Sequence, residues 1–199
     1  MRVIAGTAKG RRLRAPKGEH TRPTSDRVRE SLFASLGDRV PDAVVLDLWS
    51  GPGTLGIEAL SRGAARAVHV ERDRHALTAL RANLEATGFA DRARVVSGDV
   101  DAFAAHPSGG PFTLVFVDPP YALDTPPVWR VLKRLLRAGA LAEGATISVE
   151  RQRSRHGPEP VTLPAGVAWD GARAYGDTIL WRLVVDSDAP DAGAAGPGR

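Results

Sequence analysis

From Ala43 onward, the chain alternates between short continuous apolar runs and segments in which apolar residues recur every three to four positions. Continuous runs of this length predict strands buried on both faces, and the longer period predicts amphipathic helices. The predicted strands are 43–49, 67–71, 94–97, 112–117 and 146–150, and the predicted helices are 53–62, a segment carrying Leu77, Leu80 and Leu84, and 127–136. Strands that alternate with helices in this way predict an α/β fold with a mostly parallel central sheet covered on both sides.

The N-terminal part has a different pattern. Residues 1–18 hold one short apolar stretch and a basic run, and they predict a small strand pair or an extended arm. Thr24 or Ser25 can cap the helix that follows, whose apolar residues share one face, and Gly37 ends it. We therefore expect residues 1–38 to form a basic N-terminal extension.

The C-terminal part also departs from the alternation. Residues 161–169 and 178–185 have a strand-like composition and are joined by a turn around residues 175–177, so they predict an antiparallel hairpin. Residues 186–199 are mostly Ala, Gly, Pro and Asp, with almost nothing apolar to bury, and they predict a disordered tail. The main domain is then expected to span residues 39–185.

Composition excludes several classes of protein. The chain has 199 residues and no cysteine, which removes disulfides, thiolate metal sites and a cysteine nucleophile. Its five histidines are scattered without metal-ligand spacing, so no metal is expected. No apolar run has the length of a membrane span, and no secretory signal follows the basic N-terminus. These features predict a cytoplasmic, monomeric protein that binds no membrane.

Charge is distributed unevenly along the chain. The formal net charge is +4, but residues 1–29 hold nine Lys and Arg against two Asp and Glu, so the remainder is mildly acidic. A basic arm on an acidic body predicts contact with a polyanion such as a nucleic acid, with Arg11, Arg12 and Arg14 as candidate phosphate contacts. A solvated terminus is the alternative, because arginine greatly outnumbers lysine throughout this chain.

The first predicted strand runs into a glycine-rich turn. Gly51, Gly53 and Gly56 satisfy Gly-x-Gly-x-x-Gly, and Glu71 lies twenty residues beyond Gly51, so a dinucleotide-binding domain is an alternative. Asp47 favours a different ligand. A carboxylate at this strand end is poorly placed for a pyrophosphate but suits a cation such as the amino group of a methionine moiety. The glycines let the backbone approach such a ligand closely.

Two further acids follow the next two strands. Glu71 ends the second strand and can accept hydrogen bonds from both hydroxyls of a ribose. Asp99 follows the third strand and can accept from an adenine amino group, with Val100 lining the ring. Ligands bind at the carboxyl edge of an open α/β sheet, so acids at three successive strand ends predict a ligand site. Ordinary solvated carboxylates at helix starts are the alternative.

Asp118-Pro119-Pro120-Tyr121 follows the strand 112–117 and is the most specific motif in the chain. An exocyclic amino nitrogen of a base is a poor nucleophile because its lone pair is delocalised into the ring. A carboxylate and a backbone carbonyl that accept its N–H groups favour the pyramidal nitrogen that can attack a methyl sulfonium. The prolines hold the loop rigidly, and Tyr121 can stack on an unpaired base. A proline-stiffened strand exit is the alternative.

Together, Asp47, the glycine turn, Glu71, Asp99 and the 118–121 motif resemble the class I S-adenosylmethionine-dependent methyltransferases that act on amino groups of bases, which have a Rossmann-like fold. Within that class, four segments spread over residues 1–185 are similar to the bacterial 16S ribosomal RNA guanine-N2 methyltransferases. They are Met1-Arg-Val-Ile-Ala-Gly6, Gly10-Arg-Arg-Leu13, Arg22-Pro-Thr-Ser-Asp-Arg-Val-Arg-Glu30 and Gly56-Ile-Glu-Ala-Leu-Ser-Arg-Gly63.

The resemblance implies S-adenosylmethionine as cofactor, S-adenosylhomocysteine as product, and 16S ribosomal RNA or a small-subunit assembly particle as substrate. It implies that Asp118 and Tyr121 contact the guanine, and that the segment from Arg22 to Thr24 lies over the cofactor and the target base. It further implies cofactor contacts from Gly51, Gly53, Glu71, Asp99 and Val100. The chain departs from the family at Trp49-Ser50-Gly51-Pro52-Gly53, where Phe-Ala-Gly-Ser/Thr-Gly is usual and where Pro52 removes a backbone donor.

Three other functions compete with this interpretation. A DNA or RNA adenine-N6 methyltransferase shares the 118–121 motif, although the chain has no room for an additional target-recognition domain. An NAD-linked dehydrogenase needs a catalytic His or a Tyr-x-x-x-Lys pair, and neither is found. A non-enzymatic RNA-binding module accounts for the basic arm but leaves the acids at the strand ends unexplained.

Overall fold

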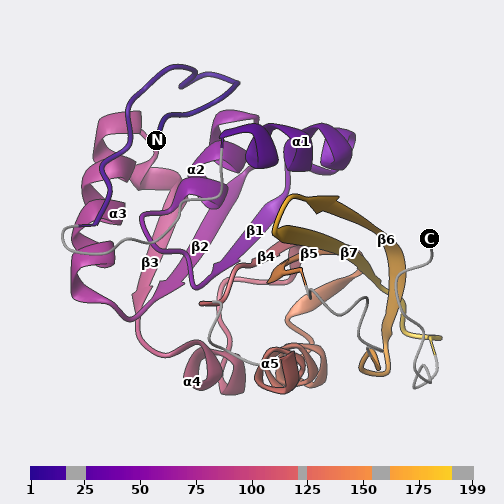
Figure 1. Ribbon diagram of the computed structural model, residues 1–199. Coiled ribbons are helices and arrows are strands. Elements are labelled where there is room, and N and C mark those ends of the chain that lie inside the picture. The colour runs from indigo at the N-terminus through magenta and orange to yellow at the C-terminus, as the bar shows by residue number, and fades with distance from the viewer. Residues whose placement is uncertain (17–25, 121–124, 154–161, 190–199) are drawn as a thin grey trace. The chain divides into compact units, whose positions relative to one another are not determined.

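The structure is a computed structural model that describes residues 1–16, 26–120, 125–153 and 162–189 (Figure 1). The chain divides into two compact units, Met1–Val100 and Asp101–Arg199. The division therefore falls within the expected main domain rather than at residue 38. None of the helices in the described ranges is long and apolar enough to cross a membrane.

The first unit is built around three parallel strands in the order β3-β2-β1 (Figure 1). Its elements are α1 (Asp26–Leu36), β1 (Val44–Leu48), α2 (Thr54–Ser61), β2 (Arg66–Glu71), α3 (Arg74–Thr87) and β3 (Ala93–Ser97). Leu48 pairs with Val70, and Glu71 pairs with Ser97. This register brings the carboxyl ends of all three strands to one edge, which is where the sequence places its candidate cofactor residues.

Local sequence signals explain these elements. β1 and β2 are formed by apolar runs whose Val and Leu side chains, except Val44 at the start of β1, are buried. In α3 the apolar period places Leu77, Leu80 and Leu84 in the core, as predicted. Asp73 caps the start of that helix by accepting from the backbone N–H of Ala76, and Gly88, in the left-handed region at φ 77°, ends it.

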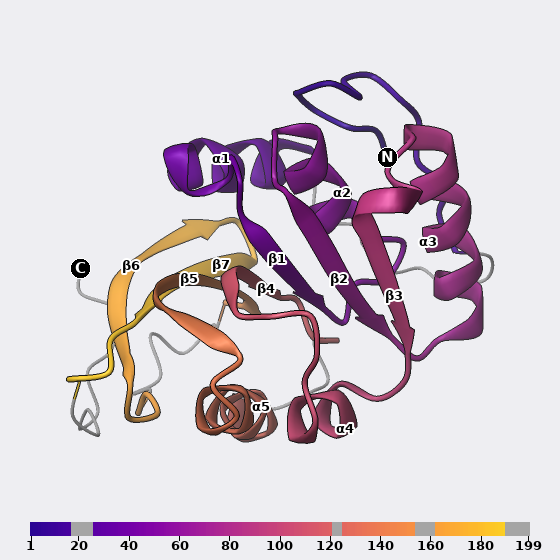
Figure 2. The same cartoon turned by 180° about the vertical axis from the view of Figure 1, so that it is seen from behind.

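The second unit continues from α4, which begins at Val100, the last residue of the first unit. Its elements are α4 (Val100–Ala105), β4 (Phe112–Val117), α5 (Thr125–Arg137), β5 (Leu141–Gln152), β6 (Val167–Tyr175) and β7 (Thr178–Val185). β4 and β5 are parallel, whereas β7 is antiparallel to both β5 and β6 (Figure 2). The predicted α/β fold, mostly parallel with a C-terminal antiparallel hairpin, is confirmed.

Three elements, β6, β5 and α4, differ clearly from the sequence prediction. The first strand of the hairpin starts at Val167 rather than at residue 161, and it continues to Tyr175 because its pairing with β7 extends to the turn. A register shift between Trp169 and Gly171 accommodates residues that are poor strand formers. β5 is longer than predicted, and α4 was not predicted because its six residues are too few for a helical period.

Residues 186–189, at the start of the predicted disordered tail, bond to other parts of the second unit. Gly166 and Asp186–Ala189 exchange backbone hydrogen bonds, from Asp186 N–H to the Gly166 carbonyl (3.0 Å) and from Gly166 N–H to the Ala189 carbonyl (3.1 Å). The Ser187 side chain also bonds to Glu143. Residues 190–199 lie outside the described residues, so the disordered tail stays a prediction.

The N-terminal arm, residues 1–16, packs against the first unit. Its predicted strand pair is present as one antiparallel bridge between Arg2 and Arg12, with Val3 N–H donating to the Arg11 carbonyl at 3.0 Å. Val3 and Leu13 are buried. The backbone of Gly6 approaches α2 so closely that a Cβ there would lie 1.8 Å from the Ser61 carbonyl oxygen.

A buried carboxylate attaches the arm to α2. Glu58 is 1% exposed; its Oε2 accepts from Ile4 N–H at 2.7 Å, and its Oε1 accepts from Ala5 N–H at 3.0 Å and from Arg62 Nε at 2.7 Å. Arg29 of α1 is also buried and donates to the Arg2 carbonyl and to Asp26. Burial lowers the pKa of the Arg29 guanidinium, and the charges of Glu58 and Asp26 oppose that shift. The arm is thus integrated into the first unit by buried polar contacts.

We expect Glu58→Ala to reduce the free energy of unfolding by about 2–4 kcal/mol, because two backbone N–H groups and the Arg62 guanidinium lose a buried acceptor. Urea denaturation measures the change. Glu85→Ala, which removes an exposed carboxylate from α3, is the control and should stay within about 0.5 kcal/mol of wild type. Equal stability of the two variants would mean that the arm is not held through Glu58.

Candidate functional site

The glycine turn after β1 is a tight loop of residues 49–53, here called the cofactor loop. Trp49, Gly51 and Gly53 all have positive φ, at 55°, 54° and 83°. Ser50 N–H donates to the Val70 carbonyl of β2 at 3.1 Å, and Gly53 N–H donates back to the Ser50 carbonyl at 2.8 Å. The loop is therefore hydrogen-bonded to the end of β2, and it leads from β1 into the first turn of α2.

Asp47, at the end of β1, is directed into the protein. It is 1% exposed, and its Oδ2 accepts from Gly56 N–H in the first turn of α2 at 2.9 Å. The same oxygen lies 3.2 Å from Nδ1 of His69, the fully buried residue that pairs with Asp47 on β2. Asp47 fixes the start of α2 relative to β1, and the contact with a ligand amino group stays a prediction.

Glu71, at the end of β2, connects both neighbouring turns. Its Oε2 accepts from Gly51 N–H at 2.8 Å, and its Oε1 accepts from the backbone N–H groups of Arg72 (2.7 Å) and Asp73 (2.8 Å). Its backbone carbonyl accepts from Gly98 N–H, in the turn after β3, at 2.9 Å. The residue is half-buried, and its carboxylate is held by three backbone N–H groups.

The glycines of this segment serve different purposes. A Cβ at Gly53 would lie 2.3 Å from Leu80 Cδ1, and one at Gly56 would lie 2.3 Å from His69 Cε1, so both positions are filled by the protein. A Cβ at Gly51 meets nothing within 4 Å. Of these three glycines only Gly51 therefore presents open backbone, and it does so beside the partly exposed residue Glu71. An open glycine turn next to a carboxylate fits a nucleoside with a free ribose.

The residues after β3 complete this edge. Asp99 is exposed, and its Oδ2 lies 3.3 Å from Nη1 of Arg72, an exposed pair of modest energy. Val100 is buried at the start of α4. The structure thus brings Asp47, Gly51, Glu71 and Asp99 to the carboxyl ends of three adjacent strands.

The predicted catalytic loop belongs to the second unit. Asp118 directly follows β4 and is half-buried, Pro119 is buried and Pro120 is exposed. Tyr121 lies outside the described residues. The sequence prediction that this loop and the cofactor loop serve one active site stays a prediction.

Asn83 of α3 is a site residue that sequence reasoning did not identify. It is fully buried, and its Nδ2 donates to the Pro52 carbonyl of the cofactor loop at 2.9 Å and to the Arg14 carbonyl of the arm at 3.1 Å. Its Oδ1 accepts from Arg14 N–H at 2.7 Å. The only signal in the sequence is an amide among the apolar positions of α3, which does not specify a partner.

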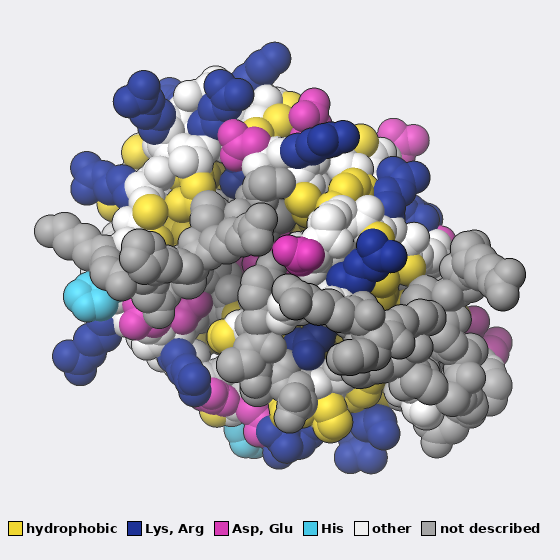
Figure 3. All heavy atoms as spheres, viewed as in Figure 1, with side chains coloured by type: hydrophobic (Ala, Val, Ile, Leu, Met, Phe, Trp, Pro, Cys, Tyr) yellow, Lys and Arg dark blue, Asp and Glu magenta, His cyan; other side chains and the backbone are white. Residues whose placement is uncertain are grey.

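The predicted RNA contacts are only partly described. Arg11, Arg12 and Arg14 are exposed, but Nη1 of Arg11 donates to the Ala86 carbonyl near the end of α3 at 2.5 Å. Arg22 and Thr24 lie outside the described residues. On the face drawn in Figure 3, Lys and Arg side chains are scattered among Asp and Glu rather than gathered in one patch.

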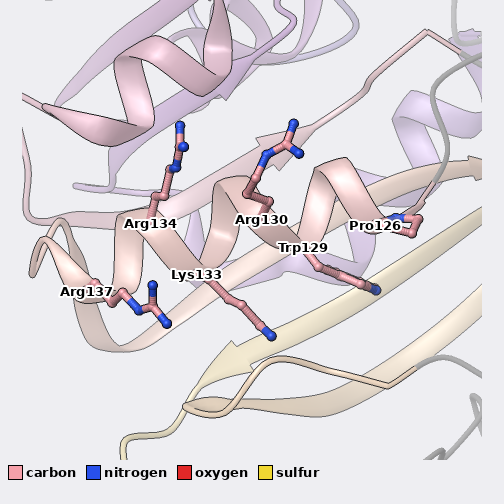
Figure 4. A pocket seen from close by; sticks show the side chains of 6 residues that line it. All are labelled: Pro126, Trp129, Arg130, Lys133, Arg134 and Arg137. Atoms are coloured by element: carbon pink, nitrogen blue, oxygen red, sulfur yellow. The ribbon is translucent and has the colours of Figure 1, made fainter.

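A separate basic surface lies on α5 in the second unit. A hollow of about 460 Å³ is lined by Pro126, Trp129, Arg130, Lys133, Arg134 and Arg137. Arg130 and Arg134 point to one side of the helix (Figure 4), where Asp101 pairs with both, at 3.1 and 2.7 Å. Trp129 stacks on Trp181 of β7 with ring centroids 6.1 Å apart. None of the residues predicted from sequence lines this hollow.

Comparison with known proteins identifies the family. The model of the family described as "Conserved hypothetical protein 95" matches residues 1–182. Ribosomal RNA small subunit methyltransferase D of Escherichia coli (strain K12) is 42% identical over 183 residues, which are 92% of this chain and 88% of that protein. The chain therefore belongs to the family described as "Conserved hypothetical protein 95", whose model matches nearly its whole length. The predicted resemblance to the ribosomal RNA methyltransferases is therefore confirmed.

Solved structures agree with this assignment. The yhhF protein of Escherichia coli superposes with a TM-score of 0.82 at 37% identity, over 94% of this chain and 99% of that one. An RNA methyltransferase from Salinibacter ruber in complex with S-adenosyl-L-homocysteine has a TM-score of 0.63 at 23% identity, over 85% of this chain and 97% of that one, and shares the fold. The fold of the family is the class I methyltransferase fold. In the described ranges, no three His, Cys, Asp or Glu side chains are grouped to hold a metal ion.

The different surroundings of the glycines predict different costs of substitution. Gly51→Ala should lower the free energy of unfolding by about 1 kcal/mol, from its positive φ alone. Gly53→Ala adds an overpacked contact with Leu80 and should cost about 1–3 kcal/mol more. Urea denaturation of both variants measures the difference. Equal losses would contradict the assignment of Gly51 as the open position.

Proposed function

We propose that this chain transfers a methyl group from S-adenosylmethionine to the exocyclic N2 of a guanine in 16S ribosomal RNA. The observation that carries the proposal is the 42% identity, over nearly the whole chain, to a ribosomal RNA small subunit methyltransferase. The arrangement at the ends of β1, β2 and β3 supports it, because it combines an open glycine with the partly exposed residue Glu71.

The cofactor is assigned to the edge of the first unit. When bound, S-adenosylmethionine supplies an electrophilic methyl group on a sulfonium. Glu71 would hold the ribose hydroxyls, Gly51 would allow close backbone approach, and Asp99 with Val100 would receive the adenine. Asp47, with one carboxylate oxygen already bonded to Gly56, would act chiefly by holding the loop in place.

Asp118 is assigned to the target nitrogen. Its carboxylate would accept an N–H of the guanine amino group and so localise the nitrogen lone pair, which is otherwise delocalised into the ring. The nitrogen would then form its new bond to the methyl carbon while the carbon–sulfur bond of the sulfonium breaks and its electron pair returns to sulfur. The surplus proton of the nitrogen would pass to Asp118 or to solvent, and S-adenosylhomocysteine would leave. Pro119 and Pro120 would hold the carboxylate in place, and Tyr121 would stack on the guanine.

The RNA is assigned to the arm and to the segment that follows it. Arg12 and Arg14 are exposed on the arm, and Arg22 and Thr24 follow in the sequence. The substrate is 16S ribosomal RNA, free or in a small-subunit assembly particle, and the reaction takes place in the cytoplasm. Adenine N6, which uses a similar catalytic motif, is the competing target.

Ligand-dependent melting tests the cofactor assignment first. S-adenosylhomocysteine should raise the melting temperature in proportion to the logarithm of its concentration, and NAD should not. Mapping the methylated nucleoside in ribosomal RNA from cells that lack the protein then identifies the base. Loss of N2-methylguanosine supports the proposal, and loss of N6-methyladenosine instead would transfer the function to the adenine-specific class.

Asp118→Ala should reduce single-turnover methyl transfer by roughly 100-fold or more, because the acceptor acts mainly in the transition state. Affinity for S-adenosylhomocysteine, measured by calorimetry, should be nearly unchanged. Asp118→Asn keeps one acceptor oxygen and should retain more activity than the alanine variant. A near-normal rate in Asp118→Ala would remove Asp118 from the reaction.

Replacing Arg11, Arg12 and Arg14 with Ala should flatten the dependence of log RNA affinity on log salt. Each phosphate contact to a single strand contributes about 0.7 to the slope, so three contacts correspond to roughly two units. The bond of Arg11 to Ala86 leaves Arg12 and Arg14 as the larger contributors. The control replaces three exposed arginines of the same unit, Arg74, Arg81 and Arg94. An equal slope in the two triple variants would assign the RNA contact elsewhere.

A further inference from the structure

Asn83 joins two segments that are far apart in the sequence. Its side chain is fully buried in α3, and all three of its hydrogen bonds go to backbone groups outside that helix. Two bonds are made to Arg14, whose N–H and carbonyl both pair with the amide, in the manner of a strand partner. The third is made to the carbonyl of Pro52 in the cofactor loop.

The orientation of the Asn83 amide is fixed by its hydrogen bonds. Both Nδ2 hydrogens are used, one for the Arg14 carbonyl at 3.1 Å and one for the Pro52 carbonyl at 2.9 Å. If the arm moves away from α3, the Asn83 side chain loses the two bonds that fix its orientation, and the donor aimed at Pro52 is no longer held. In a buried position an unmade hydrogen bond is costly, so the docked arm and the observed loop stabilise each other.

The hydrogen bond from Asn83 Nδ2 to the Pro52 carbonyl restrains the middle of the cofactor loop. Proline has no N–H, so the carbonyl is the only backbone group by which residue 52 can be held. The bond lies between Gly51, the open position beside Glu71, and Gly53, which is packed against Leu80. Restraining the Pro52 carbonyl therefore restrains the peptide group between Pro52 and Gly53, one residue beyond the open position.

We propose that Asn83 is a positioning residue: by tying the Pro52 carbonyl to the docked backbone of Arg14, it holds the cofactor loop in the conformation that receives the cofactor. This rests on the proposed function, which assigns S-adenosylmethionine to the loop. Loss of these bonds therefore weakens cofactor binding without changing the residues that would contact the cofactor.

Two substitutions at Arg14 separate the backbone bond from the side chain. Arg14→Ala removes the exposed guanidinium but keeps both backbone bonds to Asn83. Arg14→Pro removes the guanidinium and also the N–H that donates to Asn83 Oδ1. Calorimetry with S-adenosylhomocysteine alone should give wild-type affinity for Arg14→Ala and about fivefold to tenfold weaker binding for Arg14→Pro. Both variants should bind an RNA fragment of the target region more weakly.

Asn83→Leu tests the same link from the helix, because leucine fills the space and makes none of the three bonds. Its matched control is Thr87→Val, which removes a buried hydroxyl of α3 that bonds only within the helix, to the carbonyls of Asn83 and Leu84. Thr87→Val should keep wild-type affinity for S-adenosylhomocysteine. Asn83→Leu should lose as much affinity as Arg14→Pro, and the double variant should lose no more than either single variant.

Titration of wild type and Arg14→Pro with S-adenosylhomocysteine separates this inference from the proposed function. If wild type binds S-adenosylhomocysteine but Arg14→Pro binds it equally well, the inference is wrong and the proposed function stands. If wild type does not bind S-adenosylhomocysteine, the proposed function fails and this inference fails with it.

Discussion

The backbone N–H groups at the carboxyl edge of β1, β2 and β3 must be paired, and the Glu71 carboxylate supplies the acceptors. It receives N–H groups from Gly51, Arg72 and Asp73 and thereby fixes the turns after both β1 and β2. Asp47 does the same for the first turn of α2 through Gly56. Without these acceptors, the turn of residues 49–53, which has three positive φ values, would not be held in one conformation.

The arm depends on the same principle. Its polar attachment to the rest of the first unit runs through Glu58, Ser61 and Asn83, and each of these side chains pairs with arm backbone. The basic side chains of Arg12 and Arg14 consequently remain exposed while the chain that carries them is fixed. A basic segment in this arrangement can present cations in defined positions, which a solvated terminus cannot do.

The residues around the cofactor loop differ in whether they are accessible to a ligand or are held within the protein. A Cβ at Gly51 would meet open space and Glu71 is partly exposed, whereas the protein itself packs against or bonds to Asp47, Gly53, Gly56 and Asn83, which lie deeper. The residues around the cofactor loop therefore fall into those that would meet a ligand and those that hold the loop for it. The departure of this chain at Pro52 belongs to the second group, because its carbonyl is an acceptor for Asn83.

By itself, the sequence determined the order and type of most elements, the glycine turn, the acids at the strand ends and the Asp-Pro-Pro-Tyr motif, because these depend on short-range periodicity and on residues close together in the chain. It misplaced the start of β6 and missed α4, where strand pairing or packing decides. Only the tertiary structure decided that Asp47 is turned inward, that Gly51 is the open one of the three glycines, and that Asn83 meets both Arg14 and Pro52. The contacts of Asp47 with Gly56, of Asn83 with Pro52 and of Asn83 with Arg14 join residues 9, 31 and 69 positions apart, and the identity of a side chain does not specify such partners.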